Sequence, residues 1–240
     1  MQPRPPRPVA HLNPSLFLIM TAIRSFAPAL IVLAMAGSSL AAQPTEAAAL
    51  AVLASNAGVH EKARACQQLA VVAGPASIAA LAALLDNEPL ADYARSGLEN
   101  IPDPAAAEAL RKALPKLTGR HLAGVVNSLG VRHDLAAVSD LQKLAVDPQR
   151  GVASEALASL GMIGTAESAK TLRGVLTSGP AELRVPAAHA ALAAATELAK
   201  HGNPGTAREL LDLIVHSLPP GNLPAAAQRQ AATLAATPSK

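Results

Sequence analysis

Aromatic side chains are almost absent from this sequence. Among its 240 residues there are two Phe, one Tyr and no Trp, although half of the residues are hydrophobic. Alanine is the most frequent of these, so a core must consist of Ala, Leu, Val and Ile side chains packed at short helix-to-helix distances. Proteins that bind single-stranded nucleic acids stack bases on aromatic rings, and this sequence offers too few rings for that.

Acidic residues are missing from residues 1–41, which hold three arginines, Arg4, Arg7 and Arg24. The formal net charge of +3 arises from these three, because 17 of the 20 Lys and Arg residues then remain against 17 Asp and Glu. Nucleic-acid binding depends on a surplus of basic side chains that neutralise phosphates. We therefore expect no nucleic-acid partner.

Cysteine occurs once, as Cys66, which excludes a disulfide within the chain. It lies beside an apolar helical stripe, so we expect a buried, unreactive thiol. The seven histidines include no pair four residues apart, and neither a nucleophile motif nor a glycine-rich phosphate loop occurs. The sequence thus predicts no catalytic residue, no metal site and no cofactor.

Residues 1–41 have the pattern of a secretory signal peptide. Arg24 precedes an apolar run at 27–36, and small residues follow as far as Ala41. An uncleaved anchor is the alternative, but a membrane span needs roughly 20 apolar residues and Arg24 interrupts the stretch. Because Met20 would start a leader of ordinary length, we expect the true start there. The mature protein is then periplasmic or secreted, without an integral membrane span.

A repeat of about 30 residues organises the chain from residue 60 onward. Four leucines are each followed, twelve residues later, by another leucine, and the copies are 29, 31 and 31 residues apart. Apolar residues four positions before and three positions after the first leucine extend one helical stripe, with Arg132 as the exception. Leucine also recurs four positions after the second leucine, except for Ala145 in the third copy. The leucine pairs are Leu69 and Leu81, Leu98 and Leu110, Leu129 and Leu141, and Leu160 and Leu172.

Capping signals indicate where the helices begin. Asp103, Asp147 and Asn203 each precede a proline that can occupy the first helical position, and Asp134 and Thr165 are further candidate caps. No segment has the pattern of a strand, so we predict an all-α fold. The expected helices span residues 46–55, 60–73, 76–86, 89–101, 105–117, 120–130, 135–146, 149–162, 166–177, 182–200, 205–217 and 225–235.

In each unit the first helix ends in Leu-x-x-Leu-Leu-Asp and the second reads Ala-x-x-x-Leu-x-x-Ile before Gly or Pro. The closest examples are residues 82–86 with 92–101, and 147–164. This pattern resembles the HEAT repeat. The resemblance implies an α-solenoid of stacked antiparallel helical hairpins, in which neighbouring repeats bury one another's apolar stripes. The expected divisions are a signal peptide (1–41), a linker or first helix (42–59), a HEAT-like array (60–195) and divergent C-terminal helices (196–240).

HEAT-like proteins are mostly scaffolds, so the resemblance implies binding rather than catalysis. We expect an exported, non-enzymatic adaptor whose partner is a protein or an extended peptide, with its oligomeric state open. Some related bacterial proteins are lyases that act on bilin chromophores, and a bilin lyase-like enzyme is therefore one alternative. The other is a repeat module that is accessory to a larger exported enzyme.

The second helix of each HEAT pair usually lines the concave side of the array. By that analogy, polar residues after the register alanine should face a groove, where amides and hydroxyls can hydrogen-bond an extended peptide. The expected partner-binding residues are Gln67, Gln68, Arg95, Ser96, Asn127, Ser128 and Ser159. A competing candidate is an interval of basic residues without an intervening acid, formed by Arg111, Lys112, Lys116, Arg120 and Arg132.

Overall fold

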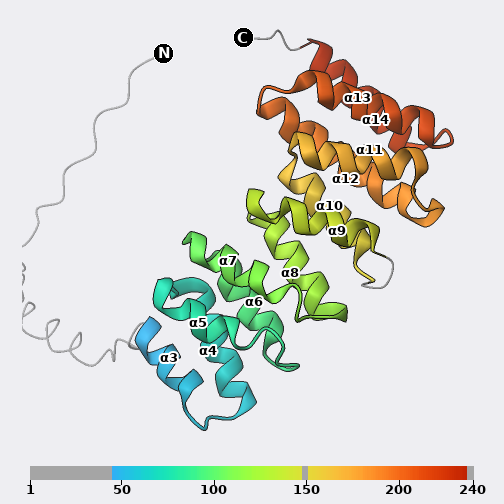
Figure 1. Ribbon diagram of the computed structural model, residues 1–240. Coiled ribbons are helices and arrows are strands. Elements are labelled where there is room, and N and C mark those ends of the chain that lie inside the picture. The colour runs from blue at the N-terminus through green and yellow to red at the C-terminus, as the bar shows by residue number, and fades with distance from the viewer. Residues whose placement is uncertain (1–44, 148–150, 237–240) are drawn as a thin grey trace, which may run out of the picture. The chain divides into compact units, whose positions relative to one another are not determined.

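The computed structural model describes residues 45–147 and 151–236, and over these residues it is all-α (Figure 1). Twelve α-helices and two short 3₁₀ segments are present there, and no strand is. The sequence-based prediction of fold class is therefore confirmed. The predicted signal peptide lies outside the described residues. Within them, no helix is both long and apolar enough to cross a membrane.

Each of the twelve predicted helices has a counterpart in the structure. Most boundaries agree within three residues; the fifth helix ends four residues earlier than predicted, and the eighth begins four residues later. Two helices open with a 3₁₀ turn, η2 (Pro75–Ser77) and η3 (Leu135–Ala137). The α-helices are α3 (Glu46–Ala54), α4 (Val59–Val72), α5 (Ile78–Ala82), α6 (Ala91–Asn100), α7 (Pro104–Ala113), α8 (Gly119–Val131), α9 (Val138–Val146), α10 (Ala153–Ile163), α11 (Ala166–Ser178), α12 (Ala181–Lys200), α13 (Pro204–Ser217) and α14 (Asn222–Ala236).

Three of the predicted caps form hydrogen bonds to the first turn that follows them. Asp103 accepts a hydrogen bond from the Ala105 amide at 2.8 Å, and Thr165 accepts one from the Ser168 amide at 3.0 Å. Asp134 accepts one from the Ala136 amide at 3.2 Å. Asp147 was predicted to start a helix at residue 149, and this is wrong. It follows the end of α9, and α10 begins only at Ala153.

The helices pack around one apolar core, and the leucine register defines it. All eight leucines of the register are at most 1% exposed. The helices α4, α6, α8, α10 and α12 form a row in which each contacts the next, and each also contacts the helix that precedes it in the chain. The first helices of neighbouring pairs also meet, as α5 does with α7 and α9 with α11.

Small residues allow the helices of this row to approach closely. A Cβ atom added to Gly130 of α8 would lie 2.8 Å from the Cα atom of Ser159 in α10. One added to Gly161 of α10 would lie 2.5 Å from the carbonyl oxygen of Ala190 in α12. Because both obstacles are backbone atoms, larger residues at these glycines would force the helices apart.

The core continues without a break into the C-terminal helices. The predicted change at residue 196 falls inside α12, which runs to Lys200. In α13, Leu210, Leu211 and Ile214 are fully buried in the same core as the repeat leucines. These helices therefore share the core of residues 60–195.

Candidate functional site

The residues predicted to bind a partner fall into two groups in the structure. Gln67, Gln68 and Asn127 are exposed on α4 and α8, and Ser96 of α6 is half-buried. Their amides and hydroxyl remain accessible. Ser128 and Ser159 are completely buried, so the expectation that these two face a groove is wrong.

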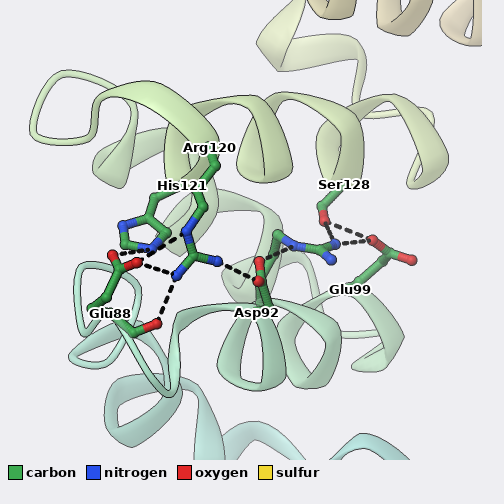
Figure 2. A network of polar contacts seen from close by, with 7 residues as sticks. Glu88, Asp92, Glu99, Arg120, His121 and Ser128 are labelled. Carbon is green, nitrogen blue, oxygen red and sulfur yellow. Dashed lines mark hydrogen bonds and ion pairs between the residues drawn. The ribbon is translucent and has the colours of Figure 1, made fainter.

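The two serines are buried because they join neighbouring helices. The Ser159 hydroxyl in α10 donates to the carbonyl oxygen of Val126 in α8 at 2.9 Å. The Ser128 hydroxyl in α8 donates to a carboxylate oxygen of Glu99 in α6 at 2.6 Å (Figure 2). A hydroxyl in such a contact satisfies buried polar groups and is not available to a ligand.

Arg95, also predicted as a partner-binding residue, belongs to the same cluster. Its Nη1 atom donates to Ser128 Oγ at 2.8 Å and to Glu99 Oε2 at 3.0 Å. The side chain also lies against Gly124, where an added Cβ would come within 2.9 Å of Arg95 Nε. Glu99 had not been singled out from the sequence, although its position four residues after Arg95 on one helix favours an ion pair.

A second polar cluster lies at the other end of the same helix pair (Figure 2). Arg120 of α8 donates to Glu88 Oε1 at 2.6 Å and to Asp92 Oδ2 at 2.8 Å. The hydrogen bond from Glu88 raises the pKa of Arg120 above its ordinary value. The Nε2 atom of His121 lies 3.2 Å from Glu88 Oε2. Together the two clusters clasp α6 against α8.

The predicted basic interval is not a free basic surface. Arg111 pairs with Asp134, and Lys112 pairs with Glu108 at 2.6 Å. Arg120 is held by the acids just described, and Arg132 donates to backbone carbonyls of the preceding helix pair. Of the five residues only Lys116 forms no ion pair or side-chain hydrogen bond within the described chain. The interval is therefore largely neutralised by partners 4 to 34 residues away in the sequence.

Three clefts recur along the first helices of successive pairs. The first lies between α5 and α7, the second between α7 and α9, and the third between α9 and α11 (Figure 1). All seven residues that line the second cleft have a counterpart 31 residues later in the third. They also have a counterpart 29 or 31 residues earlier in the first. The second-cleft residues are Arg111, Leu114, Pro115, Asp140, Lys143, Leu144 and Asp147.

The third cleft is the largest of these, at about 600 Å³ compared with about 310 and 420 Å³ for the first and second. Two substitutions within the register explain the difference. Ala145 stands where the first two clefts have Leu85 and Leu114, and Gly174 stands where they have lysines. An added Cβ on Gly174 would meet no atom within 4 Å, so the space beside it is open.

The walls of the third cleft are mostly apolar. Val146, which is 65% exposed, lies at its edge, and Val175 and Leu183 also line it. Gln142 is held in place, because its amide nitrogen donates to Thr171 Oγ1 at 2.8 Å. Among the described residues that line the cleft, Glu182 alone carries a charge. This volume and lining are typical of a small-molecule site or of a pocket for part of a peptide.

Within the described chain, no three His, Cys, Asp or Glu side chains are grouped so that they could hold a metal ion. A scan against protein-family models and a search of curated proteins each gave no match.

Proposed function

We propose that this protein is an exported α-solenoid of HEAT-like hairpins that binds another protein and performs no catalysis itself. The row of contacts from α4 to α12 supports the solenoid, because each pair of helices packs on the next as repeats do. The recurrence of all seven cleft residues at intervals of 29 and 31 supports it independently. The leader-like residues 1–41 support export.

The observation that carries the binding function is the third cleft. Helix packing normally fills the space between side chains, as the leucines of the first two clefts do. At the third cleft the register instead places Ala145 and Gly174, which leaves an apolar opening on the surface. Apolar openings with few polar groups are characteristic of recognition sites.

The polar side chains of the α6–α8 clasp support a scaffold rather than an enzyme. Catalytic acids and bases must face a space in which substrate can lie. Here Glu99 and Ser128 face each other, and Glu88 and Asp92 both face Arg120. Their contribution is to hold successive helix pairs together.

The proposal is tested by recovering the full-length chain, with a C-terminal affinity tag, from the periplasm and the medium of its own cells after mild cross-linking. We expect a protein to co-purify, and the same pair to form again from the two purified components. A chain that captures nothing beyond a tag-only control would contradict the adaptor function. An intact mass that begins at about residue 42 is expected, whereas a mass that retains residues 20–41 would contradict cleavage.

A further inference from the structure

The third cleft differs from its two counterparts in a way that defines what it can bind. We propose that it takes one large aliphatic side chain of an extended peptide, and that a Lys or Arg next to this side chain pairs with Glu182. This inference rests on the proposed adaptor function and adds the chemistry of the partner.

The aliphatic part follows from the register. In the first two clefts the chain's own Leu85 and Leu114 fill the position that Ala145 occupies in the third. Replacing Leu by Ala removes a branched aliphatic group and leaves the neighbouring apolar walls without a partner. Val146, Val175 and Leu183 surround the space that results. A leucine-sized side chain from outside restores the contacts that the repeat makes internally elsewhere.

The basic part follows from the charges. Lys112 lines the first cleft and pairs with Glu108, and Lys143 lines the second and pairs with Asp140 at 2.9 Å. The corresponding residue of the third cleft is Gly174, which supplies no cation.

The third cleft does contain an acid, at the start of α12. Glu182 is exposed at the edge of the cleft and forms no ion pair within the described residues. A cation from the partner can occupy the position that the lysines occupy in the other clefts. An acidic partner would instead be repelled by Glu182.

The rim of the cleft is suited to an extended peptide backbone. The amide nitrogen of Gln142 is engaged with Thr171 Oγ1 and with the carbonyl oxygen of Glu167 at 3.0 Å, which fixes the orientation of the amide. Its carbonyl oxygen accepts no hydrogen bond from the described residues. It can therefore accept one from the N–H of a peptide that crosses the cleft.

The test begins with a library of random nine-residue peptides displayed on phage and selected on the immobilised full-length chain. Each round is preceded by depletion on the Gly174→Lys variant, which restores the residue type of the first two clefts. The expected outcome is enrichment of peptides with Leu, Ile, Met or Phe within two positions of Lys or Arg. Failure to enrich any peptide, or enrichment of acidic peptides, would overturn the assignment.

The enriched peptide is then synthesised with a fluorescent label and titrated by anisotropy. Loss of one buried aliphatic contact corresponds to a change of about tenfold or more in Kd, so Gly174→Lys should weaken binding by at least that factor. Glu182→Lys should weaken it by about fivefold, and only for peptides that retain the basic residue. Equal binding by the wild type and Gly174→Lys would contradict the proposal.

Gly205→Lys is the matched control. Gly205 also lies in a helix, and a Cβ added there also meets no atom within 4 Å, but it belongs to α13 and lines none of the three clefts. We expect this variant to bind the peptide like the wild type. If Gly205→Lys weakened binding as much as Gly174→Lys, the effect would be one of added charge, and the site would be wrong.

The two proposals fail in different ways. If Gly174→Lys still captured the cellular partner at the wild-type level, the third cleft would not be the docking site, although the adaptor function would stand. If peptides were selected as expected but no cellular protein was ever captured, the adaptor function would fail and the peptide specificity of the cleft would remain.

Discussion

The guanidinium group of Arg132 donates a hydrogen bond to the carbonyl oxygen of Ile101 at 2.6 Å, and these two residues occupy equivalent positions in successive helix pairs. Ile101 lies three residues after Leu98, and Arg132 lies three residues after Leu129. The other register positions of this kind are apolar. Arg132 instead reaches back by one repeat and caps the C-terminal end of α6, where the last carbonyl groups of a helix have no partner within it.

Replacing Arg132 with Met should therefore destabilise the fold. The side chain also donates to the carbonyl oxygens of Leu98 and Glu99, at 3.0 and 2.8 Å. Loss of a charged donor from these carbonyls should lower the free energy of unfolding by roughly 2–3 kcal/mol. Urea denaturation provides the measurement. Arg120→Met is the control, because Arg120 pairs with exposed acids at the surface, and its loss should be much smaller. Equal losses would show that Arg132 does not act as a cap.

Two glycines in helices should respond to alanine in opposite directions. In Gly161→Ala the new methyl group would collide with backbone atoms of Ala190 in α12, so we expect a loss of about 1–3 kcal/mol. In Gly174→Ala the methyl group enters open space, and the better helix propensity of Ala should add about 0.5–1 kcal/mol. Thermal unfolding of the two variants measures both effects. A stabilised Gly161→Ala would mean that α10 and α12 are not in close contact.

The leucine register makes a third prediction. Leu98 and Leu129 are both fully buried, so truncation of either to Ala should lower the free energy of unfolding by roughly 2–5 kcal/mol. Leu135, which is 67% exposed, is the control, and Leu135→Ala should change it by no more than about 0.5 kcal/mol. Chemical denaturation of the three variants in parallel would decide. Similar small changes in all three would mean that the register does not mark the core.

Cys66 should couple folding to alkaline pH. Burial raises the pKa of its thiol from 9.0 to about 11. Between about pH 9 and 11 the unfolded chain therefore loses the thiol proton while the folded chain keeps it, so the free energy of unfolding falls as the pH rises. The loss from this group should reach roughly 1–3 kcal/mol.

The measurement for Cys66 is urea denaturation at pH 8 and pH 10.5, with Cys66→Ala as the comparison. Lysines and the tyrosine titrate in both proteins, so the difference between their pH dependences isolates the thiol. The wild type should lose more stability than Cys66→Ala over this range. An identical pH dependence would show that the thiol ionises as readily in the folded chain as in the unfolded one.

Local sequence determined the helices of this protein. The spacing of Leu69, Leu98, Leu129 and Leu160 reflects the helical period, and such a pattern indicates the buried face without knowledge of the neighbours. Asp103, Asp134 and Thr165 cap the helices that follow them, because a cap needs only residues two or three positions away. The all-α fold class followed from these local features.

Tertiary structure decided which side chains are available to a partner. Ser128 and Ser159 were expected to face a groove, but both are buried by a helix about 30 residues away in the sequence. The basic interval looked unpaired because the acids that neutralise Arg111 and Arg120 lie 23 to 32 residues away. Ala145 was visible in the sequence as the exception among leucines. That it opens a cleft depended on how α9 and α11 pack, because an opening is a property of two surfaces together.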